Sequence, residues 1–278
     1  MGPIGVFDSG MGGLTVLREL RRRLPGEDLL YFGDTARVPY GTKGARTVRA
    51  FARQDADFLV SHGAKLVVVA CNTASAFAID DLRARLPVPV LDVIAPGVDT
   101  ALRRTRGGPV GIVATRGTVE SGRYQQLLSA RLGGERVVAR ACPLFVPLAE
   151  EGMLDHDVTR RMAEEYLAPL RDAGVDTLIL GCTHYPLLKG VIGETMGPDV
   201  VLVDSAEALA GAAEAELTRR GLRRPDGGDC PEGDLAFYLS DLGVARQRFV
   251  SPGLINRFVG LPLYYGAQLL FAFSTGMV

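Results

Sequence analysis

The chain has 278 residues, of which 47% are hydrophobic and 23% are charged, and its formal net charge is −1 at pH 7. This is the composition of an ordinary globular protein, long enough for one large domain or two modest ones. The near-neutral balance excludes a chain built as a whole to attract nucleic acid or an acidic membrane.

Predicted strands and helices alternate along the first part of the chain. Short and almost continuous apolar runs predict strands covered on both faces, at Pro3–Phe7, Leu29–Phe32, Leu66–Ala70 and Val88–Val93. The stretches between and after them predict helices, at Leu14–Leu24, Thr42–His62, Thr73–Leu86 and Pro96–Thr105. This alternation of strand and helix predicts a parallel sheet.

The same pattern starts again about 110 residues later, which is the mark of an internal duplication. GPIGVFDSG (Gly2–Gly10) aligns without gaps with GPVGIVATR (Gly108–Arg116). GAKLVVVACNT (Gly63–Thr73) aligns in the same way with GVDTLILGCTH (Gly174–His184). We therefore predict an α/β protein with two pseudo-symmetric domains, each with a mainly parallel central sheet. If the two halves face each other, the active site lies in the cleft between them, whereas halves that pack back to back would not form it.

The last part of the chain is less repetitive. Asp204–Gly221 is predicted to be a helix and Arg223–Asp234 a polar loop, after which the chain is expected to return to the first half. The first domain is therefore expected to comprise residues 1–96 plus 207–278, and the second domain residues 97–206.

The sequence carries no sign of export or membrane insertion. No basic region precedes an apolar run at the N-terminus, so no signal peptide is predicted. Leu261–Phe273 is too short to span a bilayer and is predicted to be a buried helix or strand pair. The cysteines form no CxxC pair and no disulfide framework: Cys71, Cys142, Cys182 and Cys230. We expect a cytoplasmic protein with free thiols.

Cys71 and Cys182 occupy equivalent places in the duplication, each just past the carboxyl end of a predicted strand. Ligands of open α/β sheets bind at this end, so two halves that face each other would bring both thiols into one cleft. One interpretation is a pair of buried structural thiols, since free cysteine is often buried. A zinc site that includes His184 and thiol–disulfide exchange are further alternatives.

Two thiols that face one substrate carbon can also act as acid and base. One removes a proton as the thiolate while the other delivers a proton to the opposite face, which inverts a stereocentre without a cofactor. Because a free thiol is mostly protonated at pH 7, each needs an acid–base partner. His184 follows Cys182 closely, and Asp8 ends the first strand of the half that carries Cys71. Capping of the next helix is the alternative role for Asp8 and Ser9.

The glycine-rich segment Gly10–Gly13 does not match a nucleotide-binding fingerprint. Thr15 stands where G-x-G-x-x-G requires its last glycine, and the P-loop lysine motif is absent. Glycine still allows backbone N–H groups to approach a small anion. Neutral donors follow the equivalent strands, at Asn72, Thr73, Thr115, Thr118 and Thr183. Such a set suits a small carboxylate held by hydrogen bonds, and we predict no cofactor and no metal.

Three arginine runs lie at predicted helix ends or in loops, namely Arg21–Arg23, Arg103–Arg106 and Arg219–Arg224. We interpret them as solvated faces favoured by the helix dipole, and we do not expect nucleic acid as a partner. A non-catalytic module that binds an amino acid or DNA remains the alternative of a different class.

Four stretches occur in order along the chain: GVFDSGMGGLTVL, YFGDTARVPYG, VVACNTASA and GCTHYPLL. Together they resemble glutamate racemases of the cofactor-independent aspartate/glutamate racemase superfamily, over most of residues 4–205. The resemblance implies two α/β domains and the interconversion of L- and D-glutamate, the D-form serving peptidoglycan synthesis. It also implies a homodimer without membrane contact. A racemase of the same superfamily for aspartate or a related carboxylate is the nearest alternative.

The resemblance also implies roles for individual residues. The catalytic cysteines of the family match Cys71 and Cys182. Their supporting acid–base residues match Asp8 and His184. The substrate contacts match Asp8, Ser9, Pro39, Tyr40, Gly41, Asn72, Thr73, Thr118, Thr183 and His184.

Two further matches distinguish the halves. A supporting glutamate matches Glu150, although Glu151 is adjacent and the choice between them stays open. Ala114, where a glycine is expected from the resemblance, is also the duplicate of Asp8. One half therefore has a carboxylate beside its thiol, whereas the other relies on His184.

Overall fold

The computed structural model describes residues 2–224 and 233–240, whose strands form two sheets. The strands of the first are β1 (Ile4–Asp8), β2 (Leu29–Gly33), β3 (Leu66–Val69), β4 (Val90–Asp92) and β9 (Leu235–Leu239). Those of the second are β5 (Val110–Ala114), β6 (Val137–Ala141), β7 (Thr177–Gly181) and β8 (Val201–Asp204). All strand pairs in both sheets are parallel.

The strand order confirms the duplication. The first sheet runs β4-β3-β1-β2-β9, and the second, taken in the matching direction, runs β8-β7-β5-β6. The first four positions correspond, with β3 equivalent to β7 and β1 equivalent to β5. The strand β9 adds to the edge of the first sheet beside β2, so residues 235–239 return to the first half as expected.

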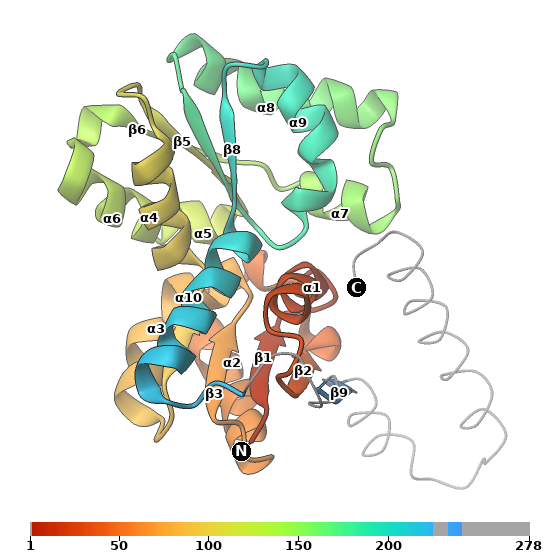
Figure 1. Ribbon diagram of the computed structural model, residues 1–278. Coiled ribbons are helices and arrows are strands. Elements are labelled where there is room, and N and C mark those ends of the chain that lie inside the picture. The colour runs from red at the N-terminus through yellow and green to blue at the C-terminus, as the bar shows by residue number, and fades with distance from the viewer. Residues whose placement is uncertain (1, 225–232, 241–278) are drawn as a thin grey trace, which may run out of the picture.

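Helices cover both faces of each sheet, which confirms the predicted α/β class (Figure 1). On the first sheet, α1 (Leu14–Arg23) and α10 (Ser205–Arg220) lie opposite α2 (Ala45–Ser61) and α3 (Asn72–Arg85). On the second, α4 (Ile94–Arg104) and α6 (Arg123–Leu132) lie opposite α8 (Asp157–Asp172) and α9 (Lys189–Met196). The shorter helices are α5 (Arg116–Glu120), α7 (Phe145–Glu150), η1 (Thr35–Arg37), η2 (Tyr40–Thr42), η3 (Gly134–Arg136) and η4 (Tyr185–Leu188).

One hydrophobic core is continuous between the two halves. Ile4 of β1 and Ile112 of β5 belong to the same buried cluster, together with residues of α1, α4, α6 and α10. Phe7 and Val113 point to the opposite faces of their sheets and belong to separate clusters. Figure 1 shows α10 running from the end of β8 into the lobe of the first sheet. Burial of apolar surface therefore joins the halves on the side of α4 and α10.

Local sequence sets the ends of two helices that matter for the site. Asp204 caps α10 by accepting the N–H of Ala206 at 2.9 Å, and Gly221, at φ 66°, ends it in the left-handed conformation. The helix α3 begins directly after Cys71, whose Sγ accepts the N–H of Ala74 at 3.4 Å. The strand end that carries this thiol is therefore also the start of a helix.

Two helix starts differ from the prediction by more than one residue. The helix predicted at Pro96–Thr105 begins earlier, at Ile94, because Asp92 Oδ1 accepts the N–H of Ile94 at 2.8 Å. The helix predicted at Thr42–His62 begins at Ala45, because the backbone of the two residues before it is extended.

Some sequence predictions remain untested by this structure. The predicted segment Leu261–Phe273, Cys230 and most of the loop Arg223–Asp234 lie outside the described residues. The predicted domain limits stay predictions, since α4 and α10, which connect the sheets, also contact each other. Within the described ranges, no helix is long and apolar enough to cross a membrane.

Candidate active site

The carboxyl ends of strands from both sheets meet at the junction of the two halves. Asp8 ends β1, Cys71 follows β3 and Cys182 follows β7; all three are buried, with the thiol residues 5% and 7% exposed. Thr183 Oγ1 donates a hydrogen bond to Asp8 Oδ1 at 3.4 Å, and Thr15 Oγ1 donates to the backbone oxygen of Thr183 at 3.0 Å. The duplicated strand ends therefore share one site.

The Cys71 thiol lies in a buried and negatively charged environment. Its Sγ is 3.6 Å from Ser9 Oγ, to which the thiol can donate. Burial, together with the charges of Asp8 and Cys182, raises the pKa of the Cys71 thiol to about 12, although hydrogen bonds with the Ala74 N–H and Ser9 oppose this. A thiol with such a pKa holds its proton at neutral pH.

Asp8 belongs to the site rather than to a helix cap. The N-cap of α1 is Gly13, and Asp8 Oδ2 instead accepts the N–H of Gly10 at 2.9 Å. The capping interpretation is therefore wrong. Burial raises the pKa of the Asp8 carboxyl, although the charge of His184 and hydrogen bonds from Gly10, Gly13 and Thr183 oppose this.

Cys182 is linked to a histidine and a glutamate. Its Sγ lies 3.8 Å from His184 Nδ1, and His184 Nε2 lies 3.1 Å from Glu150 Oε1. Burial alone lowers the pKa of His184, but hydrogen bonds to Cys182 and Glu150 and their negative charges raise it to about 10. Glu150, at the end of α7, makes this contact, so the geometry favours Glu150 over Glu151.

The glycine-rich segment packs directly on these side chains. A Cβ atom at Gly12 would lie 2.5 Å from His184 Cε1 and 2.5 Å from Thr183 Oγ1. At Gly13 it would lie 2.4 Å from Asp8 Cβ. Such distances are well below van der Waals contact, so the site tolerates only glycine here. The segment thus brings the β1 loop against the Cys182 side of the site.

A cluster of hydroxyl groups lies between α3 and α5. Thr73 Oγ1 is 3.0 Å from Thr115 Oγ1 and 3.1 Å from Thr118 Oγ1, and the latter two are 2.9 Å apart. Three hydroxyls can donate to one another in a ring or turn toward a ligand. The cluster connects the two halves of the protein with neutral groups.

The amide nitrogen of Asn72 finds no hydrogen-bond partner in the part of the chain that the structure describes. Tyr124 Oη donates to Asn72 Oδ1 at 2.7 Å and lies 3.5 Å from Ser205 Oγ. Asn72 Nδ2 is buried and has no hydrogen-bond partner among the described residues. Leaving such a group unsatisfied costs about 1–3 kcal/mol, which a ligand that accepts its hydrogen bond would offset. No motif in the sequence pointed to Tyr124 or Ser205, which orient this amide.

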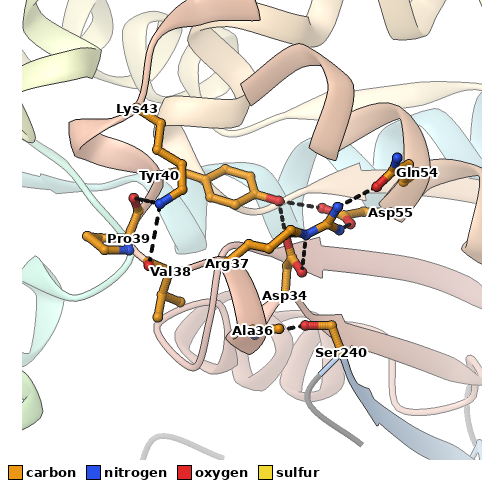
Figure 2. A network of polar contacts seen from close by, with 10 residues as sticks. All are labelled: Asp34, Ala36, Arg37, Val38, Pro39, Tyr40, Lys43, Gln54, Asp55 and Ser240. Atoms are coloured by element: carbon orange, nitrogen blue, oxygen red, sulfur yellow. Dashed lines mark hydrogen bonds and ion pairs between the residues drawn. The ribbon is translucent and has the colours of Figure 1, made fainter. Parts of the chain in front are cut away.

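The Pro39-Tyr40-Gly41 segment approaches the same place through its backbone. A Cβ atom at Gly41 would lie 2.7 Å from Thr115 Cβ, so this segment packs against the second half. The Tyr40 hydroxyl is turned toward Asp34 and Asp55 (Figure 2). Any polar contact between this segment and a ligand therefore falls to the backbone.

The alternatives drawn from the cysteines and arginines can be compared with the structure. Cys71, Cys142 and Cys182 are free thiols, and in residues 2–224 and 233–240 no group of three His, Cys, Asp or Glu side chains could hold a metal ion. The arginines of the predicted helix ends lie in the last turns of α1, α4 and α10, as expected. Several pair with acidic side chains, such as Arg23 with Glu214 at 2.6 Å.

Comparison with known proteins defines the class. The sequence profile of the Asp/Glu/Hydantoin racemase family matches residues 4–213. The glutamate racemase of Geobacter metallireducens is 52% identical over 258 residues, which is 92% of each chain. The solved glutamate racemase of Thermus thermophilus in complex with β-chloro-D-alanine is 48% identical, with a TM-score of 0.77 over 86% of this chain and 87% of that one.

A third relative has a D-glutamate complex. The solved glutamate racemase of Francisella tularensis in complex with D-glutamate is 38% identical, with a TM-score of 0.79 over 86% of this chain and 88% of that one. The chain therefore belongs to the Asp/Glu/Hydantoin racemase family. The resemblance to glutamate racemases seen in the sequence is confirmed, as is the prediction of an amino-acid racemase.

Proposed function

We propose that this racemase interconverts L- and D-glutamate by proton transfer at Cα between two cysteine thiols, without a cofactor, and that the D-glutamate serves peptidoglycan synthesis. One observation carries the mechanism. Cys71 and Cys182 lie in one buried site, and each stands beside a different acid–base group. The names of the relatives and the D-glutamate complex of one of them support glutamate as the substrate.

The environments of the two sulfurs suggest which one carries the negative charge before substrate binds. With a pKa of about 12, Cys71 is a thiol at neutral pH. The His184 imidazolium, whose pKa is raised to about 10, lies 3.8 Å from Cys182 Sγ and stabilises a negative charge there. In this resting form, Cys182 removes the Cα proton of one enantiomer and Cys71 delivers a proton to the opposite face.

Turnover exchanges the protonation states of the thiols. After one inversion Cys71 is a thiolate and Cys182 is a thiol, which is the form that accepts the other enantiomer. Asp8 lies close enough for its charge to act on Cys71, and its raised pKa allows it to hold a proton. We propose that Asp8 supports Cys71 as His184 and Glu150 support Cys182.

Neutral donors are proposed to hold the two substrate carboxylates. The unsatisfied Nδ2 of Asn72 and the hydroxyls of Thr73, Thr118 and Thr183 can all donate to a carboxylate. Donors without charge bind the substrate carboxylates without adding a second cation beside the thiols. This arrangement favours a small dicarboxylate over a phosphorylated ligand.

We expect the purified protein to racemise L-glutamate in D₂O without added cofactor. The circular dichroism signal should decay to zero, and mass spectrometry should find deuterium at Cα, because the delivered proton comes from a thiol that has exchanged with solvent. Retention of the Cα protium, or an absolute need for pyridoxal phosphate, contradicts the mechanism. L-Aspartate in a parallel assay tests the nearest alternative, and a protein without turnover of either amino acid points to a binding module.

Gly12→Ala should lower kcat/KM for glutamate by about tenfold or more, because a Cβ 2.5 Å from His184 Cε1 displaces the imidazole by a fraction of an ångström or more. The matched control is Gly44→Ala, where a Cβ meets nothing within 4 Å and φ is −70°. We expect the control to keep the wild-type kcat/KM and melting temperature. Equal activity of the two variants would show that the close contact does not position His184.

A further inference from the structure

Four polar side chains form a largely buried network behind the Pro39-Tyr40-Gly41 segment, in which only Arg37 is partly exposed (Figure 2). We call it the Tyr40 cluster, and it comprises Asp34, Arg37, Tyr40 and Asp55. Asp34 follows β2, Arg37 ends η1, Tyr40 begins η2 and Asp55 lies on α2. Both carboxylates are fully buried, and Tyr40 is 1% exposed. The proton-transfer steps proposed above use none of these four side chains.

If both carboxylates of the Tyr40 cluster were ionised, the cluster would have one hydrogen too few for its two contacts with the Tyr40 hydroxyl. Tyr40 Oη is hydrogen-bonded to Asp34 Oδ2 and lies 2.9 Å from Asp55 Oδ2. A hydroxyl has one hydrogen, so it can donate to only one of these oxygens. If both carboxylates were ionised, the other contact would join two acceptors in a buried place, which is unfavourable. One further proton, held by a carboxyl group, satisfies both contacts.

The position of Arg37 indicates which carboxyl group holds this proton. Arg37 Nε lies 2.8 Å from Asp34 Oδ1 and 2.6 Å from Asp34 Oδ2, whereas Asp55 receives one contact, from Nη2 to Oδ1 at 2.8 Å. The guanidinium therefore compensates an ionised Asp34 better than an ionised Asp55. A proton on Asp55 Oδ2 can donate to Tyr40 Oη, and Tyr40 can then donate to Asp34.

The surrounding charges agree with this assignment. Burial and the charge of Asp34 raise the pKa of Asp55 to about 8, Arg37 and the Tyr40 hydroxyl oppose this, and Asp8 of β1 adds to it. The charged side chains of α3 that meet α2 pair with its other residues, namely Asp81 with Arg53 and Arg85 with Asp57.

The Tyr40 cluster is connected to the proposed substrate site through the backbone. Tyr40 stands between Pro39 and Gly41, and Gly41 packs against Thr115 of the hydroxyl cluster. Lys43 Nζ also donates to the Pro39 oxygen, at 3.2 Å. A fixed Tyr40 ring therefore fixes the segment that lies against the substrate-binding hydroxyls.

We propose that Asp34, Arg37 and Asp55 are positioning residues of the racemase: a neutral Asp55 donates to Tyr40, which donates to an ionised Asp34, and this chain clamps the Pro39–Gly41 segment in its substrate-binding position. The inference rests on the proposed function. Loss of the Asp55 proton breaks the chain, so substrate binding weakens at alkaline pH while the proton-transfer chemistry is not directly touched.

Two amide variants distinguish the carboxyl groups. Asp55→Asn keeps a donor toward Tyr40 and an acceptor toward Arg37, as a protonated carboxyl does, so KM for glutamate should stay within about twofold of wild type at pH 7. Asp34→Asn removes the ionised acceptor, so KM should rise about tenfold with a smaller change in kcat. Asp57→Asn is the matched control on α2, because Asp57 is exposed and pairs with Arg85.

The pH dependence supplies a readout that a merely structural role would not produce. We expect the ratio of wild-type KM to Asp55→Asn KM to rise between pH 7 and 9.5, because only the wild type loses a proton from the Tyr40 cluster. The folded-state pKa of Asp55 is raised, so its stabilising contribution is complete below about pH 4 and is lost as the pH rises to about 8. The difference in melting temperature, Asp55→Asn minus wild type, should therefore increase from pH 5 to 8 and stay constant above pH 8.

Several results would overturn the inference. KM profiles of wild type and Asp55→Asn that run parallel, or an Asp55→Asn variant as impaired as Asp34→Asn at pH 7, contradict the clamp. A melting-temperature difference that does not change with pH contradicts the proton on Asp55, and this measurement needs no substrate. If wild type fails to racemise glutamate, the proposed function fails, and the melting-temperature comparison still decides whether Asp55 holds the proton.

Discussion

Cys71→Ala and Cys182→Ala should each lower kcat for glutamate racemisation by at least about 10⁴-fold, the upper range for loss of a general acid or base. Each sulfur is proposed to serve one face of Cα, so neither can replace the other. Cys142→Ala is the matched control. Cys142 is a buried free thiol in the core of the second half, where its Sγ contacts the Arg140 oxygen, so we expect reduced stability with kcat retained.

Cys71→Ala and Cys182→Ala should differ in which enantiomer of glutamate exchanges its Cα hydrogen with solvent. A single remaining thiol can remove and return a proton on one face, which exchanges the Cα hydrogen with solvent without inversion. In D₂O, Cys71→Ala should label one enantiomer of glutamate and Cys182→Ala the other. Mass spectrometry of each pure enantiomer after incubation measures this. Labelling of the same enantiomer by both variants, or wild-type racemisation by either, refutes the paired-thiol mechanism.

His184→Asn should have the second-largest effect, a fall in kcat of about 10²- to 10³-fold, because it removes the cation that stabilises a Cys182 thiolate. The pKa of His184 is raised to about 10, so the imidazolium persists through neutral pH and wild-type activity should fall as the pH rises through about 10. The stability that this cation contributes is complete below about pH 6.5 and is lost by about pH 10. The gap in melting temperature between wild type and His184→Asn should narrow over that window.

The equilibrium between enantiomers supplies an internal check on this variant. L- and D-glutamate have equal free energies, so kcat/KM must fall by the same factor in both directions, although kcat and KM can change separately. Glu150→Gln is the graded comparison, since Glu150 is about half exposed and acts on the sulfur only through His184. Its effect should be smaller, about tenfold. A larger loss in Glu150→Gln than in His184→Asn would contradict this order of contacts.

The sequence predicted the central thiols because the duplication and the sheet topology together determine their location. Both cysteines follow equivalent apolar strands, and the carboxyl ends of parallel strands lie at one edge of a sheet. The assignment of Asp8 and His184 followed from the same argument. The structure adds that the halves face each other, which the spacing of residues along the chain did not determine.

Other parts of the site left no local signal. Asp55 lies on a helix with many charged residues, and only the folding of η1 and η2 over that helix buries it. Tyr124 and Ser205 meet Asn72 from distant parts of the chain. For Gly12 the sequence indicated an approach to an anion, whereas the structure shows an approach to His184 and Thr183. Contacts of this kind depend on tertiary packing rather than on local pattern.

The unequal ends of the two central strands have a kinetic consequence. Asp8 ends β1 and Ala114 ends β5, so in the proposed mechanism the two thiols that serve the two faces of the substrate have unlike supporting groups. That mechanism implies two forms of free enzyme with unequal populations, one ready for each enantiomer, and every net conversion leaves the enzyme in the form that suits the reverse reaction. At high concentrations of a single enantiomer, the return of the unliganded enzyme to its starting form can limit the net flux. The Asp8 and His184 pairs would then control how fast the empty enzyme resets.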